Sequence, residues 1–383
     1  MPHGVESLTW RQVDAWRMAR DHLTVPAPAD DLLGVVRRAC GIQAQVLSAA
    51  GLALSARIPE LRVGDVDSAL WEHRSLVKVH GLRSTIHLVG ADDVALHMAA
   101  MRAHPWGRDG AWLKNHGLDP AGAGVLLDAI GAALDGRRLT REDLANEVAA
   151  RAGGWVLEAM RSNWGSLLGP AAFAGLLCFG PSVGPRVTFV RLDQWIDGWN
   201  DLDPDASMLE IVRRFLSAYG PAGTAEIGAW LGLRPAEARR YLEALGPELM
   251  QVSVEGRDGW CLAADLDSLH DATADAPPTA PTLRLLPQYD SYILGHRQRD
   301  RLVPPPAKAH IAADPKGRLE HVVGVSTILV DGVVGGIWRR IRRGRRLDIT
   351  IEPVTELTET HRQLLQQEVA RVGAFLGLDA ALV

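Results

Sequence analysis

The sequence predicts an α+β protein built from three tandem winged helix-turn-helix units and a C-terminal β-rich domain that forms a partial barrel. Two observations lead to this prediction. Several helical segments followed by a β-hairpin pattern occur three times before residue 271, and beyond residue 282 the pattern is mostly β with one closing helix. No strict period relates the three units, so the order of elements is the signal of duplication. The predicted boundaries are 7–120, 121–200 and 201–270 for the three units, 271–282 for a linker and 283–383 for the β-rich domain.

Hydrophobic periodicity predicts the elements of each unit. In the first unit, the helices are expected at 8–23, capped by Ser7 or Thr9, at 32–40, capped by Asp30 or Asp31, and at 66–73, with an alternating hairpin at 76–89. In the second unit, helices are expected at 125–134, at 140–148 and from 164, with a hairpin at 176–190. In the third unit, helices are expected at 208–219, 224–233 and 235–245, with a hairpin at 249–262.

The segment 271–281 is rich in Ala, Pro and Asp, as linkers are. The strands of the β-rich domain are expected at 283–286, 321–330, 333–341 and 347–351, and its closing helix at 359–376.

Composition narrows the class of protein. The chain has 383 residues, of which 47% are hydrophobic and 23% charged, values typical of globular domains. The N-terminus resembles no secretion signal, and the apolar stretch at 170–180 is too short to span a bilayer. Cys40, Cys178 and Cys261 are too far apart for a disulfide framework or a zinc site. We therefore expect a cytoplasmic protein that uses no metal and no cofactor.

Charge is unevenly distributed along the chain. The net charge is −5, yet the segment 291–347 contains twelve Lys and Arg residues against four acids, which gives this segment +8 and the remainder −13. A basic face on an acidic body is typical of a protein that contacts phosphate, although a charge run can also be a merely solvated surface.

Gln43 and Gln45 flank Ala44 in an apolar segment that follows a predicted helix. A buried Gln carries two donors and two acceptor lone pairs that need partners, so the pair is a candidate site. Bonds to neighbouring backbone or to solvent would make it structural instead. If the segment were an ideal helix, the two amides would point about 200° apart, and Gly41 is where we expect the helix to be interrupted.

An arginine-rich hairpin is the second candidate site. Its basic residues fit contact with phosphates, and its aromatic residue fits groove insertion, although Trp338 and Ile341 are also candidates for simple packing. The candidate DNA-binding residues are Trp338, Arg339, Arg340, Arg342, Arg343, Arg345 and Arg346 of this hairpin, with Arg83 and His87 of the first predicted wing.

The combination of Gln43-Ala44-Gln45 in the first winged-helix unit, two further units, and the stretch Leu286-Pro287-Gln288-Tyr289-Asp290-Ser291-Tyr292 opening a β domain resembles the AlkZ-like DNA glycosylases over nearly the whole chain. The resemblance implies a C-shaped DNA-binding channel with the Gln-x-Gln pair in the active site. Gln45, where the related YcaQ branch has Asp, is similar to the AlkZ branch.

What this resemblance implies for function is specific. The chain is expected to be a monomeric, monofunctional DNA glycosylase that acts in base excision repair on double-stranded DNA containing cationic N7-alkylated purines, with Gln43 and Gln45 as catalytic residues. Bulky adducts or interstrand crosslinks of an alkylating antibiotic are possible substrates, which would give self-resistance. The alternatives are a non-catalytic winged-helix regulator of transcription and an interaction scaffold.

Overall fold

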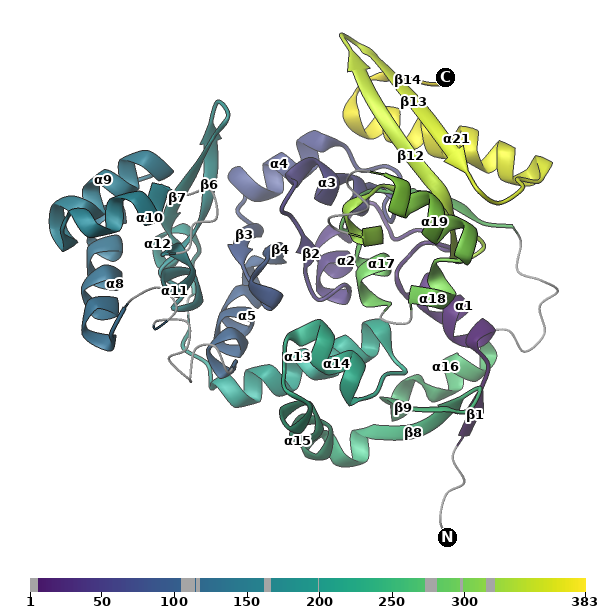
Figure 1. Ribbon diagram of the computed structural model, residues 1–383, viewed down its shortest axis with the longest axis horizontal. Helices are drawn as coiled ribbons and strands as arrows, with labels where there is room; N and C mark the ends of the chain where they lie inside the picture. The colour runs from purple at the N-terminus through teal and green to yellow at the C-terminus, as the bar shows by residue number, and fades with distance from the viewer. Residues whose placement is uncertain are drawn as a thin grey trace. The chain divides into compact units, whose positions relative to one another are not determined.

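The computed structural model describes residues 6–104, 114, 118–161, 167–198, 200–272, 281–296, 299–314 and 321–383. Within it the chain forms two compact units. The first comprises Met1–Val66, Val212–Trp230 and Arg234–Val383, and the second comprises Asp67–Ile211 and Leu231–Leu233. The N-terminal helices and the C-terminal β-rich domain therefore belong to the same compact unit, although they lie at opposite ends of the sequence (Figure 1).

The first unit begins with short elements joined by tight turns. In order, they are β1 (Glu6–Leu8), α1 (Trp10–Arg20), α2 (Leu32–Arg38), β2 (Ile42–Gln43) and α3 (Leu47–Ser55), and α4 (Val63–Trp71) leads out of the unit. Thr9 caps α1 in a capping box with Gln12, so the second of the two predicted caps is correct. Asp31 is the N-cap residue of α2.

The middle of the chain returns to the same unit with a helical segment and a hairpin. Its elements are α13 (Pro204–Tyr219), α14 (Thr224–Leu231), α15 (Pro235–Leu245), β8 (Leu249–Val254), β9 (Arg257–Leu262) and α16 (Leu266–Asp271). Strand β1 pairs in parallel with β8, so three residues from the start of the chain extend this hairpin to a three-stranded sheet.

The C-terminal domain is a five-stranded mixed sheet in the order β10-β11-β12-β13-β14. Its elements are β10 (Leu283–Leu286), α17 (Ser291–Gly295), α18 (Arg299–Leu302), α19 (Pro305–Ala313), β11 (Thr327–Val330), β12 (Val333–Arg343), β13 (Arg346–Pro353), α21 (Glu359–Leu376) and β14 (Asp379–Leu382). Both edges of the sheet remain open, as a partial barrel requires. The segment 321–330, expected to be one strand, is a 3₁₀ turn at His321–Gly324 followed by β11.

The second unit contains two hairpins and the helices around them. Its elements are β3 (Leu76–His80), β4 (Ile86–Gly90), α5 (Ala91–Ala103), α8 (Pro120–Leu134), β5 (Leu139–Thr140), α9 (Arg141–Ala152), α10 (Leu157–Arg161), α11 (Leu168–Phe173), β6 (Leu177–Val183), β7 (Arg186–Arg191) and α12 (Leu192–Trp195). Buried residues of β3, β4, α5 and of the β6–β7 hairpin form one apolar cluster.

The helix and hairpin order predicted three times is present in the described chain, and α+β is confirmed as the fold class. The boundaries of the three units and their winged-helix nature stay predictions. Residues 273–280 of the predicted linker, and the expected helix start at Trp164, lie outside the described residues. No helix within the described ranges is long and apolar enough to cross a membrane.

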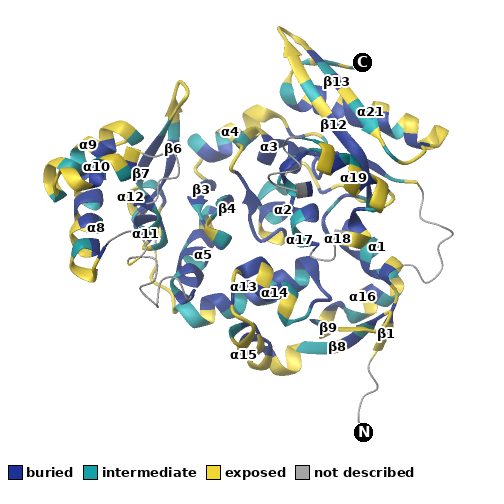
Figure 2. Cartoon of the chain, in the orientation of Figure 1, coloured by how far each residue is buried: buried dark blue, intermediate teal, exposed yellow. Residues whose placement is uncertain are grey.

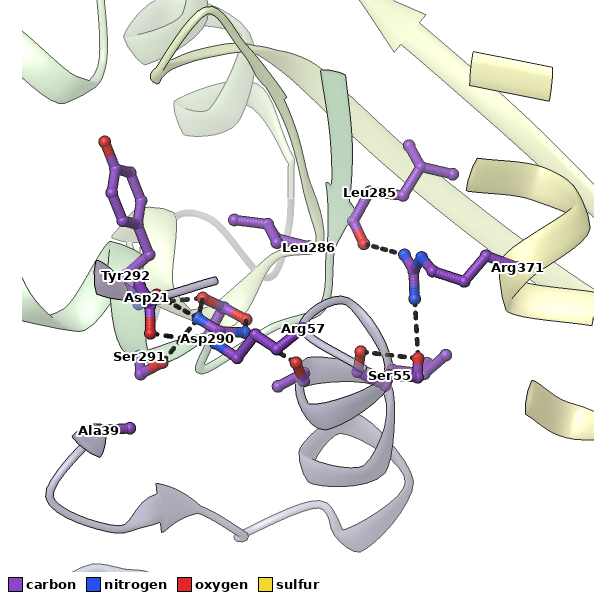
Figure 3. A network of polar contacts seen from close by, with 12 residues as sticks. Asp21, Ala39, Ser55, Arg57, Leu285, Leu286, Asp290, Ser291, Tyr292 and Arg371 are labelled. Atoms are coloured by element: carbon purple, nitrogen blue, oxygen red, sulfur yellow. Dashed lines mark hydrogen bonds and ion pairs between the residues drawn. The ribbon is translucent and has the colours of Figure 1, made fainter. Parts of the chain in front are cut away.

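A buried ion cluster centred on Arg57 joins the N-terminal helices to the C-terminal domain (Figure 3). The Arg57 side chain is fully buried and bonds to both Asp21 and Asp290, with Nη1 and Nη2 each 2.9 Å from an Asp290 oxygen and Nε 3.0 Å from Asp21 Oδ1. It also donates to the Ala53 carbonyl and to the Ser291 hydroxyl at 2.7 and 2.8 Å. Five donors are thereby used, so a single guanidinium fixes α1, α3 and α17 together.

A second arginine continues the junction. Arg371 of α21 donates to Ser55 Oγ at 2.7 Å and to the Leu285 carbonyl at 3.1 Å, and it pairs with Glu368 at 2.6 Å. Glu368 in turn accepts the Leu285 N–H at 2.8 Å. Helix α21 is therefore bonded to both α3 and β10.

Replacing Arg57 by Ala should lower the free energy of unfolding by about 3–5 kcal/mol, because two buried carboxylates would lose their shared partner. Chemical denaturation measures this. As a control, Arg362→Ala removes the exposed Arg362–Glu359 pair of α21 and should cost at most about 1 kcal/mol. An equal, small effect of both variants would show that the cluster does not stabilise the junction.

The cluster also gives a pH dependence. Burial of the Asp21 carboxylate raises its pKa to about 6, because the effect of burial is larger than the opposing effect of the Arg57 charge. The folded state therefore holds a proton that the unfolded state releases near pH 4, so this stabilisation is present below pH 4 and is lost as the pH rises to about 6. Relative to Asp21→Asn, the wild type should lose roughly 2 kcal/mol of stability between pH 4 and 6 in parallel denaturation series. A constant difference across that range would contradict it.

Candidate active site and nucleic-acid interface

The chain leaves helix α2 through a turn formed by two residues with positive φ. Cys40 has φ 56° and Gly41 has φ 90°. The Cys40 N–H donates to the Arg37 carbonyl at 3.0 Å and the Gly41 N–H to the Val36 carbonyl at 2.9 Å, the bonding pattern of a Schellman motif. The predicted interruption at Gly41 is therefore confirmed, and it ends the helix completely.

The chain is extended at Gln43, which lies in β2, and it bends at Gln45. Helix α3 begins at Leu47 after its N-cap residue Val46. The two amides therefore do not lie on one helix, and the helical separation of about 200° does not apply. The Gln43 side chain is buried, with 8% exposure, whereas Gln45 is exposed.

A hydrogen bond from α13 holds the turn that precedes Gln43. Tyr219 of α13 donates its hydroxyl to the Ala39 carbonyl at 2.8 Å, and both residues are buried. Because Ala39 is the C-cap residue of α2, this bond fixes the point from which the chain reverses toward Gln43.

Arg17 of α1 holds the chain just beyond Tyr219. Its guanidinium is buried and donates to the carbonyls of Tyr219, Gly220 and Pro221 at 2.7, 3.1 and 3.1 Å. Three backbone acceptors compensate for the loss of water around the buried cation. Hydrogen bonds therefore join α1 to the end of α13, and the end of α13 to the turn before the candidate site.

The predicted arginine hairpin is formed by β12 and β13, whose pairing extends to Arg343 and Arg346. Its end is exposed (Figure 2). Arg343 and Arg346 share the Asp348 carboxylate at 3.1 and 2.5 Å, and Arg342 donates to the Gly344 carbonyl at 2.9 Å. Of the four arginines near the turn, Arg343 and Arg346 form ion pairs with one shared carboxylate, which leaves positive charge in excess at the tip.

Arg339 and Arg340, farther from the turn of the hairpin, contact side chains of other elements. Arg339 pairs with Asp314 at 2.6 Å and with Glu352 at 3.2 Å. Arg340 is half-buried, and burial lowers its pKa from the usual arginine value. Its Nη2 lies 3.4 Å from Ser48 Oγ of α3, three residues after Gln45. The base of the hairpin and the segment carrying Gln45 are therefore close to each other.

The two apolar members of the hairpin behave differently. Trp338 is buried, with 3% exposure, and its indole N–H donates to the Leu286 carbonyl at 2.8 Å. This placement agrees with a packing role for Trp338. Ile341 is 58% exposed, so the packing role considered for it is wrong.

Arg83 and His87 lie in the second compact unit and contact each other. Arg83 has φ 60° in the turn between β3 and β4, and its Nη2 lies 3.0 Å from His87 Nε2. His87 is buried, and burial together with the Arg83 charge holds its pKa well below the usual histidine value, so the ring is neutral. DNA contact by these two residues stays a prediction.

Sequence patterns did not reveal the polar junction beneath the site. Asp290 and Tyr292, within the stretch that suggested the family, serve structure: Asp290 binds Arg57, and Tyr292 donates to the Gly332 carbonyl at 3.1 Å. The excess of polar residues in an otherwise apolar strand-to-helix segment was the available signal. Arg57, the partner of Asp290, is 233 residues away in the sequence.

Part of the predicted positive charge is also neutralised locally. Arg301 pairs with Asp14 at 3.3 Å and Lys308 with Asp300 at 3.1 Å. Arg297, Lys316 and Arg318 of the counted segment lie outside the described residues. Among the described arginines of the segment, the excess is concentrated at the hairpin tip.

Comparisons with known proteins identify the family to which the chain belongs. The family model described as DNA glycosylase AlkZ-like matches residues 36–375. An interstrand DNA cross-link repair glycosylase of Streptomyces sahachiroi is 31% identical over 380 residues, which cover 97% of each chain. The solved structure of the Streptomyces sahachiroi DNA glycosylase AlkZ matches with a TM-score of 0.80 and 30% identity, covering 98% of this chain and all of that one. This chain therefore belongs to the AlkZ-like DNA glycosylase family.

Proposed function

We propose that this protein is a DNA glycosylase that hydrolyses the N-glycosidic bond of cationic N7-alkylated purines in double-stranded DNA, including bulky adducts and interstrand crosslinks. Family membership supports the glycosylase class, and the name of the Streptomyces relative supports crosslinks as substrates. The observation that carries the proposal is the position of the Gln43–Gln45 segment, between the end of α2 and the start of α3, close to the base of the arginine hairpin.

Neutral amides suit this chemistry. An N7-alkylated purine already carries positive charge and is a good leaving group, so strong protonation of the base is unnecessary. What remains is to orient water against C1′ and to stabilise the positive charge that develops on the sugar. Amide oxygens can do both through oriented hydrogen bonds and dipoles. A more stable glycosidic bond would call for a carboxylate base.

We assign Gln43 and Gln45 to this task as a pair. Gln43 lies in the short strand β2 and Gln45 in the bend after it, so the nearly opposite directions that a helix would impose on the two amides do not apply. Gln43 is the buried member and its orientation is restricted by its surroundings, whereas exposed Gln45 is free to adjust to the substrate. A fixed amide and an adjustable one can together hold one water.

The rest of the molecule is assigned to duplex binding. In this proposal the three helix-and-hairpin units are winged helices that line a C-shaped channel, and Arg339, Arg340, Arg342, Arg343, Arg345 and Arg346 contact the DNA backbone. A transcriptional regulator would need its polar residues on exposed recognition helices. Gln43 and Gln45 instead follow the tight turn that ends α2, outside any helix, which favours the enzyme.

Replacing either Gln43 or Gln45 by Ala should slow release of N7-methylguanine about 10²–10³-fold, the usual loss for one oriented hydrogen-bonding group at a reacting centre. Single-turnover excision from an alkylated duplex measures it. Gln366→Ala, at an exposed position of α21, is the matched control and should keep the wild-type rate. Parental rates in both active-site variants, with folding verified by circular dichroism, would remove the pair from catalysis.

Replacing Arg342, Arg343, Arg345 and Arg346 by Ala should weaken duplex binding and flatten its salt dependence, since each lost phosphate contact removes about 0.9 from the slope of log K against log salt. Fluorescence anisotropy between 50 and 200 mM salt, roughly the range over which such contacts dominate, measures the slope. Arg11→Ala with Arg362→Ala removes exposed charge elsewhere and should leave it unchanged. An unchanged slope in the hairpin variant would exclude the hairpin from the interface.

A further inference from the structure

A pocket of about 620 Å³ lies between the start of α3 and strand β12. This α3–β12 pocket is bounded by Ala49 of α3, by Pro287 and Gln288 after β10, by Ser326 before β11, and by the run Ile337–Ile341 of β12. Its volume is in the range of cavities that hold small organic molecules. The contact between Arg340 and Ser48 lies beside it, so the pocket adjoins the segment that carries Gln45.

Strand β12 contributes both apolar and charged side chains to the wall of the pocket. Ile337, Arg339 and Ile341 occupy alternate positions and face the same side, and Thr350 is directly opposite Arg339 on β13. The charge of Arg339 is balanced by Asp314, which also lines the pocket. Ile341, which is 58% exposed, therefore presents uncovered apolar surface at the pocket, and the neighbouring Arg339 charge is already paired.

The residues that line the pocket fit an apolar substituent on the base better than the cationic purine itself. Gln43 and Gln45 do not line the pocket, so the purine, whose bond to C1′ is broken beside these amides, lies outside it in the proposed mechanism. The lesion base is cationic, and the half-buried Arg340 in the wall disfavours a second cation. An uncharged apolar group attached to the base is not repelled by Arg340, and in the pocket it covers the apolar surfaces of Ile341 and Ala49.

We propose that the α3–β12 pocket binds the apolar substituent carried at N7 of the alkylated purine, and that Ile341 and Thr350 help to determine which substituents are accepted. This inference rests on the proposed glycosylase function and specifies its substrate class. N7-methylguanine has too small a substituent to fill the pocket, whereas an aromatic substituent can enter it.

The test compares two duplexes, one with N7-methylguanine and one with N7-benzylguanine, in single-turnover excision. Thr350→Phe places a ring in the pocket from an exposed strand position. We expect it to keep the N7-methylguanine rate within about twofold and to slow N7-benzylguanine release at least tenfold. Ala381→Phe adds the same ring at an exposed position of β14, outside the pocket lining, and should change neither rate.

The outcomes separate the inference from the proposed function. Equal slowing of both substrates by Thr350→Phe, or slowing of neither, would overturn the pocket assignment while leaving the glycosylase assignment intact. Failure of the wild type to release either base would instead overturn the proposed function. In that case, binding to a duplex with hydrolysis-resistant 2′-fluoro-N7-benzylguanosine decides the pocket: weaker binding by Thr350→Phe supports it, and equal binding contradicts it.

Discussion

The structure of the larger compact unit depends on the buried Arg57 guanidinium. Helices near the N-terminus and a β domain near the C-terminus must share an interior, and Arg57 meets Asp21 and Asp290 there with no exposed side-chain surface of its own. A cation in such a place is tolerated only when its donors are fully used, and this one uses them on α1, α3 and α17. The ends of α1 and α3, and hence the Gln43–Gln45 segment between them, are held against the β domain by this cluster.

The candidate site is a consequence of that junction. Because α3 is fixed at its C-terminal end by Arg57 and Arg371, its N-terminal end is held near β12, where Ser48 meets Arg340. Tyr219 and Arg17 support the preceding turn from the other side. Amides that orient water are effective only when they are positioned in advance, and the polar contacts around this short segment provide such support.

The base and the tip of the arginine hairpin differ in how far their charges are paired. Toward its base, Arg339 is paired with Asp314 and Glu352 and contributes to the wall of the α3–β12 pocket. Toward its tip, two of four arginines share one carboxylate, and the remaining positive charge is exposed. In the proposed function, the tip contacts the DNA backbone without regard to sequence, and the base meets a particular adduct.

By itself the sequence determined the local structure: the periodic helices, the alternating hairpins, the break at Gly41 and the arginine-rich hairpin all follow from preferences that act within a few residues. It did not determine the conformation after that break, where the positive φ angles of Cys40 and Gly41 lead into the short strand that carries Gln43. Nor did it indicate that Asp290 belongs to Arg57, or that Ile341 stays exposed beside a pocket. Those features depend on contacts between residues hundreds of positions apart, and only tertiary packing chooses among the many partners that such polar and apolar side chains have available.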